Sequence, residues 1–166
     1  MSTIRPMSDA DWPAVVAFWS ETVEAGETHA FPLGLSSEEA RGWWDEAPPG
    51  ATVVLEEDGE VLGSAKMGPN RPGRGSHVGT ASFMVAPHAR GRGVGRRLGE
   101  HVVRGHQEQG YAAIQFNAVV ETNTAAVALW RSLGFTVVGT VPGAFESAAH
   151  GRVGLHVMHL PLQGLG

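Results

Sequence analysis

Residues 83–95 read FMVAPHARGRGVG, an apolar run followed by three glycines that alternate with other residues. Gly91, Gly93 and Gly95 stand where a predicted strand at residues 77–85 gives way to a predicted helix. Glycine lets the backbone approach a ligand closely, and the first amides of a helix point outward without intrahelical partners. The stretch therefore predicts an anion-binding site of the kind that holds a pyrophosphate.

Positive charge surrounds these glycines and would favour a pyrophosphate further, through Arg90, Arg92, Arg96 and Arg97. Two common phosphate-binding loops do not fit. A Walker loop needs a Gly-Lys-Ser/Thr ending, which is missing here, and a dinucleotide fingerprint starting at Gly93 would need glycine where Leu98 stands. The sequence therefore indicates neither ATP nor NAD.

Outward from this stretch, apolar periodicity and turn residues predict the element order βααβββαβαββ. The strand–helix–strand unit at residues 77–119 requires a parallel crossover, which gives a mixed sheet with helices on both faces. The predicted strands lie at residues 3–7, 51–56, 60–67, 77–85, 114–119, 135–141 and 152–160. The predicted helices begin near Asp9, after Ser36 or Ser37, at the arginine-glycine segment and at about Thr124. A loop with Pro142, Glu146 and His150 is expected to join the last two strands. We therefore predict an α/β (α+β) mixed-sheet fold in a single domain, residues 1–166.

Composition narrows the function classes. The 166 residues are 42% hydrophobic and 17% charged, which fits a globular chain, and the net charge of −5 disfavours nucleic acid as a partner. The chain has no cysteine, so it offers neither a disulfide framework nor a thiolate metal site. No metal is expected, because His156 and His159 point to opposite faces of their strand. No apolar run is long enough to span a membrane, and a cytoplasmic protein is expected.

The glycine stretch resembles the acetyl-coenzyme A motif of the GCN5-related N-acetyltransferases, the GNAT family. The family motif is Arg/Gln-x-x-Gly-x-Gly/Ala, and Arg90 to Gly95 match it. A second signature follows at residues 123–135, NTAAVALWRSLGF, which is similar to Asn-x-x-Ala-x-x-Leu-Tyr-x-x-Leu-Gly-Phe. With its flanking strands the resemblance covers roughly the whole chain. It implies the GNAT fold, acetyl-CoA as co-substrate and transfer of the acetyl group to an amine.

The same resemblance implies a V-shaped cleft between two splayed parallel strands, one of which ends at Val85. The backbone of Met84 and Val85 would hold the pantetheine and the thioester oxygen, and Asn123 would hold the cofactor from the second of the two motif helices. The residues that the resemblance assigns to the cofactor are Met84, Val85, Arg90, Gly91, Arg92, Gly93, Val94, Gly95, Arg96, Asn123, Ala126 and Trp130.

Trp130 departs from the family pattern, since many relatives have there a tyrosine whose hydroxyl is proposed to protonate the departing thiolate. An indole N–H does not release its proton near neutral pH, so Trp130 is not a general acid and is expected to pack in the core. A thiol of pKa about 8.5 needs only modest help to leave. The missing tyrosine keeps a second interpretation open, a non-catalytic acyl-CoA- or CoA-binding module.

Three residues are candidates for the acceptor chemistry: Asn117, His77 and Glu27. Asn117 lies on the strand that borders the predicted cleft, where its amide would orient a carboxylate or an amine of the acceptor. His77, at the start of the cofactor strand, and Glu27, in the first interhelical loop, are candidate bases for the incoming amine. His29 and Glu146 are alternatives. Three further histidines, His88, His101 and His106, are expected on helix surfaces.

Residues 115–123, QFNAVVETN, resemble acetyltransferases that act on proline analogues, and the chain also resembles phosphinothricin-type acetyltransferases. The resemblance implies a small primary or secondary amine as the acceptor, an amino acid or an imino acid-like molecule. The two apolar final strands and the family resemblance together predict a homodimer, because exposed strand edges need to be covered.

Overall fold

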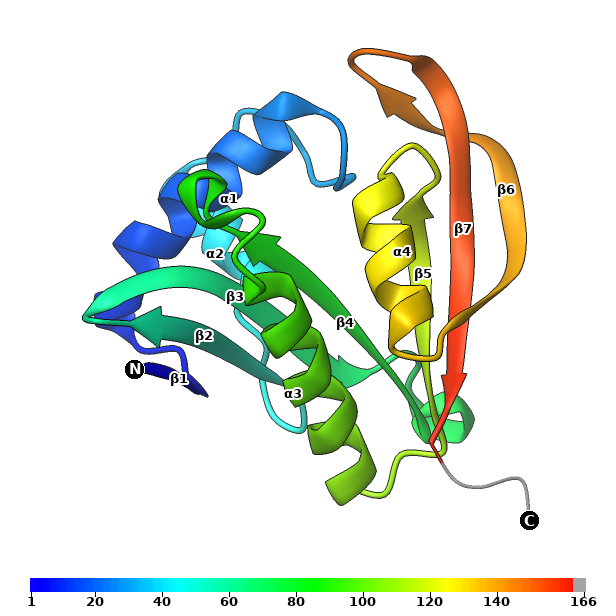
Figure 1. The fold of residues 1–166 in the computed structure, drawn as a ribbon, viewed down its shortest axis with the longest axis horizontal. Helices are drawn as coiled ribbons and strands as arrows, with labels where there is room; N and C mark the ends of the chain where they lie inside the picture. The colour runs from blue at the N-terminus through cyan, green and yellow to red at the C-terminus, as the bar shows by residue number, and fades with distance from the viewer. Residues whose placement is uncertain (163–166) are drawn as a thin grey trace.

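The computed structural model describes residues 1–162, which form seven strands and four helices (Figure 1). In chain order the elements are β1 (Ser2–Pro6), α1 (Trp12–Ala25), α2 (Ser37–Trp44), β2 (Ala51–Glu57), β3 (Glu60–Pro69), β4 (Val78–Val85), α3 (Val94–Glu108), β5 (Ala113–Val120), α4 (Thr124–Ser132), β6 (Thr136–Ser147) and β7 (Gly151–Pro161). The predicted order βααβββαβαββ is confirmed. In this described range no helix has the length and apolar character needed to cross a membrane.

The strands of residues 1–162 form one sheet in the order β1-β2-β3-β4-β5-β7-β6. β4 and β5 are parallel, and the five other neighbouring pairs are antiparallel. α3 supplies the crossover that a parallel pair requires. The predicted mixed sheet is therefore confirmed, and its parallel pair lies at the centre.

A capping turn sets the start of α1. The backbone N–H of Ser8 donates to Asp11 Oδ2 at 2.7 Å, and residues 9–11 form a 3₁₀ turn before the α-helix begins at Trp12. The sequence places this start three residues too early. Pro13 explains the difference, because proline has no N–H and fits only the first turn of an α-helix. Gly26, with φ of +70°, ends α1 as predicted.

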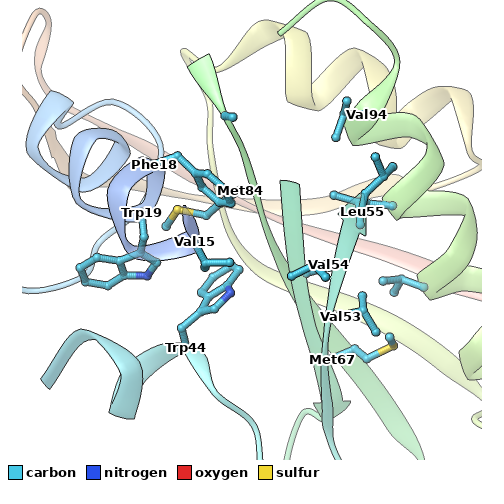
Figure 2. Close-up of a cluster of buried hydrophobic side chains, with 14 of the residues drawn as sticks. Val15, Phe18, Trp19, Trp44, Val53, Val54, Leu55, Met67, Met84 and Val94 are labelled. Carbon is cyan, nitrogen blue, oxygen red and sulfur yellow. The ribbon is translucent and has the colours of Figure 1, made fainter. Parts of the chain in front are cut away.

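One face of the sheet is covered by α1 and α2. Val15 and Trp19, on the predicted apolar stripe of α1, are buried and lie beside Met84 of β4 (Figure 2). Trp44, at the end of α2, is fully buried, and its Nε1 donates to Ser64 Oγ of β3 at 2.9 Å.

The opposite face is covered by α3. Val94, Leu98 and Val102 recur every fourth residue, are each at most 1% exposed and pack toward β3 and β4. Burying each of these side chains contributes roughly 1.5–3 kcal/mol. His106 continues the same stripe and is 1% exposed, so its expected surface position is wrong. Helices on both faces of the sheet are confirmed.

The last two strands are longer than expected. β6 continues to Ser147, so most of the expected loop at residues 142–150 is strand, and only a short turn remains before β7. The register shifts between Val141 and Phe145, where Gly143 has φ of +61°. This bulge absorbs Pro142 and Gly143, and pairing with β7 then resumes. Glu146 therefore lies on a strand.

Candidate active site

β4 and β5 separate after two paired positions. Val78 pairs with Ala113 and Gly79 with Ile114, and beyond them the strands diverge as a V (Figure 1). The cavity between them has a volume of about 820 Å³, a size typical of small-ligand sites. Its walls come from the end of α1 and the loop after it, from β4 and β5, from the glycine segment and from α4.

The glycine segment forms the wall where α3 begins. Gly91 and Gly93 have φ of +77° and +79°, and α3 starts directly afterwards at Val94. A Cβ atom added at either glycine would meet no atom within 4 Å, so the space in front of this backbone is open. The first amides of α3 have no acceptor inside the helix and favour an anion. The structure therefore offers the open, amide-lined cradle that a pyrophosphate needs.

The arginines of this segment divide into two groups. Arg90 and Arg96 line the cavity, and Arg96 also donates to Ser132 Oγ of α4 at 2.6 Å. Arg92 and Arg97 do not line it; their guanidinium groups lie 3.6 Å and 3.3 Å from the Glu57 carboxylate. Of the predicted cofactor residues in this segment, Arg92 is thus directed toward β2.

The register between β3 and β4 decides which backbone groups of β4 face the cleft. The N–H of Ala86 donates to the carbonyl of Leu62 at 2.8 Å. Partners in an antiparallel pair alternate between hydrogen-bonded and non-hydrogen-bonded, so Met84 and its partner Ser64 also form a hydrogen-bonded pair. The backbone N–H and C=O of Met84 therefore belong to the sheet.

By the same alternation, Ala81, Phe83 and Val85 turn their backbone groups away from β3, and all three residues line the cleft. Val85, which was predicted to hold pantetheine through its backbone, turns its backbone groups toward the cleft, and that role stays a prediction. Met84, which was predicted alongside it, lines the cavity, but its backbone groups face β3, because a shift of one position along a strand turns these groups to the opposite edge.

The floor of the cleft is aromatic. Trp130 of α4 is buried, with its ring centroid 4.6 Å from that of Phe83 and 4.9 Å from that of Phe116. Gly99 of α3 fits closely against it, since an added Cβ would lie 2.9 Å from Trp130 Cζ3. Trp130 thus both packs in the core, as predicted, and lines the cavity.

The start of α4 forms the wall opposite the glycine segment. Asn123 is its N-cap and accepts a hydrogen bond from the N–H of Ala126 at 3.4 Å. Both residues line the cavity together with Ala125 and Leu129, so this part of the second signature faces the first. A Cβ added at Gly95 would lie 3.4 Å from Leu129, so the absence of a side chain at Gly95 allows α3 and α4 to pack closely.

A second group of cavity residues is polar and belongs to the other face of the sheet. Thr80 and Ser82 alternate along β4 with Ala81 and Phe83, so their side chains point to the α1 side. These residues were missed from the sequence, although two hydroxyl residues at alternate positions of an apolar strand were a readable signal.

His29 lies on the same side, in the loop after α1. Its Nδ1 is 2.8 Å from Thr28 Oγ1, and its ring stacks on Phe31 at a centroid distance of 5.8 Å. The side chain keeps some exposure at the cavity wall, but protein surrounds most of it. This burial lowers the pKa of His29 to about 4, and a hydrogen bond to the Phe83 backbone opposes part of the fall. At neutral pH the ring is therefore uncharged.

Asn117 lies on the β5 wall within a chain of amides. Gln115 Nε2 donates to Asn117 Oδ1 at 2.9 Å, and Asn117 Nδ2 donates to Asn70 Oδ1 at 2.6 Å. The side chain is exposed and lines the cavity, so the two neighbours orient it toward the space between β4 and β5.

Glu27 and His77, the two other acceptor-side candidates, have different surroundings. Glu27 lines the cavity, but both of its carboxylate oxygens accept hydrogen bonds from residues after β6 or at its end, Ser147 and Ala149. His77 is exposed at the narrow end of the V and does not line the cavity. We therefore assign no catalytic role to His77.

A parallel strand pair that opens beside an amide-lined anion site, with a second helix facing it, is the arrangement that the resemblance to the acetyl-CoA-dependent transferases implies. Residues 13–135 match the model of the "Acetyltransferase (GNAT) family". The chain belongs to this family and is an acetyl-CoA-dependent N-acetyltransferase. Acetyl-CoA is its co-substrate, and the open cradle at Gly91 and Gly93 fits the pyrophosphate of that molecule.

Three similar proteins illustrate this membership. The L-methionine sulfoximine/L-methionine sulfone acetyltransferase of Pseudomonas aeruginosa is 33% identical over 150 residues, which are 85% of this chain and 84% of the relative. The solved GCN5-related N-acetyltransferase from Kribbella flavida is 57% identical with a TM-score of 0.94, covering 97% of this chain and 98% of that one. The yncA protein of Salmonella typhimurium, solved with acetyl-CoA, is 26% identical with a TM-score of 0.82, covering 100% and 96%.

Proposed function

We propose that this N-acetyltransferase acts on a small primary or secondary amine, an amino acid or an imino acid-like molecule. The observation that carries the proposal is the polar wall on the α1 side of the cavity, which contains Thr28, His29, Thr80, Ser82 and Asn117. This wall is compact, largely uncharged and rich in hydrogen-bonding groups, as a small polar acceptor requires. The P. aeruginosa relative, which is named for two amino acid analogues, supports the same class of acceptor.

The chemistry joins the acceptor nitrogen to the acetyl carbon while the carbon–sulfur bond breaks and coenzyme A leaves as the thiol. The nitrogen must come within about 3–3.5 Å of the thioester carbon. Only the neutral amine attacks, and the proton that it loses balances the departing thiolate through solvent. Trp130 does not donate this proton, since its indole N–H is not acidic at neutral pH. In this proposal the wall residues bind and orient the acceptor.

Asn117 is the residue that we place in direct contact with the acceptor. Gln115 and Asn70 fix the orientation of its amide, and the amide still has one hydrogen and one lone pair to offer. These groups suit the carboxylate or the nitrogen of an amino acid. A hydrogen bond of this kind contributes about 1 kcal/mol, equivalent to roughly a fivefold change in affinity.

The acceptor class is tested by coenzyme A thiol release with a panel of amines. The panel contains methionine sulfone, methionine sulfoximine, proline and a peptide that begins with alanine. We expect turnover with at least one of the amino acids and none with the peptide. Turnover with the peptide alone would contradict the proposal and point to a protein N-terminus as the acceptor.

Asn117→Ala tests the proposed contact. We expect the acceptor KM to rise, or kcat to fall, by about fivefold, while coenzyme A affinity stays within about twofold, because only the acceptor loses a partner. Gln107→Ala, an exposed change on α3 outside the cavity, is the matched control. Unchanged acceptor kinetics in Asn117→Ala would remove this residue from the site.

A further inference from the structure

We propose that Glu27 is a positioning residue that ties the loop after α1 to the β6–β7 turn and so bridges the acceptor end of the cleft. The idea rests on the proposed function, because it concerns the site of the small amine. In Figure 1 the end of α1 and the β6–β7 turn both lie above the open end of the V. The first belongs to the half of the molecule that contains β4, and the second to the half that contains β5.

The bridge consists of hydrogen bonds that span about 120 residues of sequence. Ser147 Oγ donates to Glu27 Oε2 at 2.7 Å, and the N–H of Ala149 donates to Glu27 Oε1 at 2.8 Å. The N–H of Ala148 donates to the carbonyl of Gly26 at 3.0 Å. Ser147 is 3% exposed, and its Oγ also accepts from the N–H of His150 at 3.0 Å. Both oxygens of the Glu27 carboxylate are thus used by the turn.

Gly26 allows the loop after α1 to lie close to the β6–β7 turn. This residue has φ of +70°, and an added Cβ would lie 3.2 Å from Ala148 Cβ. A larger side chain would therefore both strain the backbone and push the turn away. Because the carboxylate accepts from Ser147 and Ala149, the pKa of Glu27 is lowered, and the group stays ionised at neutral pH. A carboxylate that is held in this way is a hydrogen-bond acceptor for the turn rather than a base for the amine.

The same loop is anchored to the other arm of the V through His29. The Phe83 backbone opposes part of the burial-induced fall in the pKa of His29, so the imidazole lies beside β4, and both residues line the cavity. Residues 26–29 therefore contact both arms, the β6–β7 turn through Glu27 and β4 through His29. Glu27, Thr28 and His29 also line the cavity, so the bridge is part of its wall. Under this proposal the bridge admits a small molecule and disfavours an amine carried by a long polypeptide, such as an internal lysine, which would have to pass beneath it.

The test compares Glu27→Ala with Glu24→Ala, an exposed glutamate on the last turn of α1 that serves as the matched control. The acceptors are the best amino acid of the panel and a peptide with an internal lysine. In Glu27→Ala we expect the amino acid KM to rise at least about fivefold, because the wall of the acceptor site loses the hydrogen bonds that hold it to the turn. Coenzyme A affinity should stay within about twofold. The ratio of kcat/KM for the peptide to kcat/KM for the amino acid should rise. The amino acid KM of Glu27→Gln, which keeps one acceptor oxygen, should lie between those of the wild type and Glu27→Ala.

A second readout does not depend on the acceptor. Amide hydrogen exchange at Ala148 and Ala149 should be faster in Glu27→Ala and in Ser147→Ala than in Glu24→Ala, because their hydrogen-bond acceptors are lost or loosened. Ser147→Ala serves if Glu27→Ala does not fold. Unchanged exchange at these amides, or an unchanged KM and acceptor preference in a folded Glu27→Ala, would overturn the proposal. If the wild type acetylates no small amine, the proposed function fails, and the exchange experiment alone then decides whether the bridge exists.

Discussion

Gly93 combines two requirements at one position. Its φ of +79° is a conformation that a residue with a Cβ rarely adopts, and the space in front of it is open. Nothing in the packing of the protein demands glycine there, because an added Cβ meets no atom within 4 Å. The demand comes from the backbone conformation and from the ligand that must lie against the exposed amides.

Gly93→Val should therefore weaken coenzyme A binding more than it weakens the fold. The branched side chain would occupy the space of the pyrophosphate, and we expect at least a tenfold rise in Kd, equivalent to about 1.4 kcal/mol. Gly59→Val is the matched control, since Gly59 has φ of +83°, equally open surroundings and a place in the β2–β3 turn. Calorimetric titration should show lost affinity in Gly93→Val alone. Equal affinities in the two folded variants would contradict the site.

Among the elements, α3 was the easiest to predict from the sequence. Its glycine start and its stripe at every fourth residue come from local rules, and both are present in the structure. His106 occupies the next position of the same stripe, yet a polar residue is not expected in a core. The structure resolves this conflict, because His106 Nδ1 lies 2.8 Å from the carbonyl of Val102 and the ring packs against Gly79. The signal that could have placed His106 in the core was its spacing of four residues from Val102 on the buried stripe.

The polar wall on the α1 side of the cavity was much harder to predict from the sequence. Glu27 was identified from its loop as a candidate base, but its partner Ser147 lies 120 residues away, and no local pattern connects them. The backbone partners of Met84 depend in the same way on the register with β3, which a sequence does not specify. The residues of the two local motifs thus lie together along one half of the cleft, whereas the other half depends on contacts between distant segments.

The contact between α3 and β4 gives a prediction at the scale of elements. A Cβ added at Gly79 would lie 2.2 Å from His106 Cδ2, so Gly79→Ala should separate the helix from the strand and destabilise the protein by roughly 1–3 kcal/mol. Gly105→Ala, on α3, would meet only Met67 Sδ at 4.0 Å and should be neutral or stabilising. Urea unfolding measures both. A Gly79→Ala protein as stable as the wild type would show that the contact is not tight.

On the scale of the whole molecule, β6 forms one edge of the sheet, and Val138 and Val141 on it are 67% and 53% exposed. An exposed apolar edge is where a second copy would be expected to pack. The homodimer and the cytoplasmic location stay predictions.

The stability of the whole molecule should fall as the pH drops from about 6.5 to about 4. Burial lowers the pKa of His29 to about 4 and also lowers that of His106, whereas an unfolded chain protonates both near 6.5. Between these values the unfolded state binds more protons, so the stabilisation is complete above pH 6.5 and is lost toward pH 4. Asp11 contributes mainly below this window, because its carboxyl binds a proton in the unfolded chain only near pH 3.8, while Arg5 holds the native pKa lower still.

The variant His29→Gln measures how much of this pH dependence of stability comes from His29. Glutamine is neutral at every pH and can still donate to the Phe83 backbone, so the variant should lose less melting temperature than the wild type between pH 7 and pH 4.5. His77→Gln, a change at an exposed histidine outside the cavity, should follow the wild type. Scanning calorimetry at the two pH values measures the difference. Parallel declines in all three proteins would mean that His29 is solvated in the native state and binds its proton near pH 6.5, as it does in the unfolded chain.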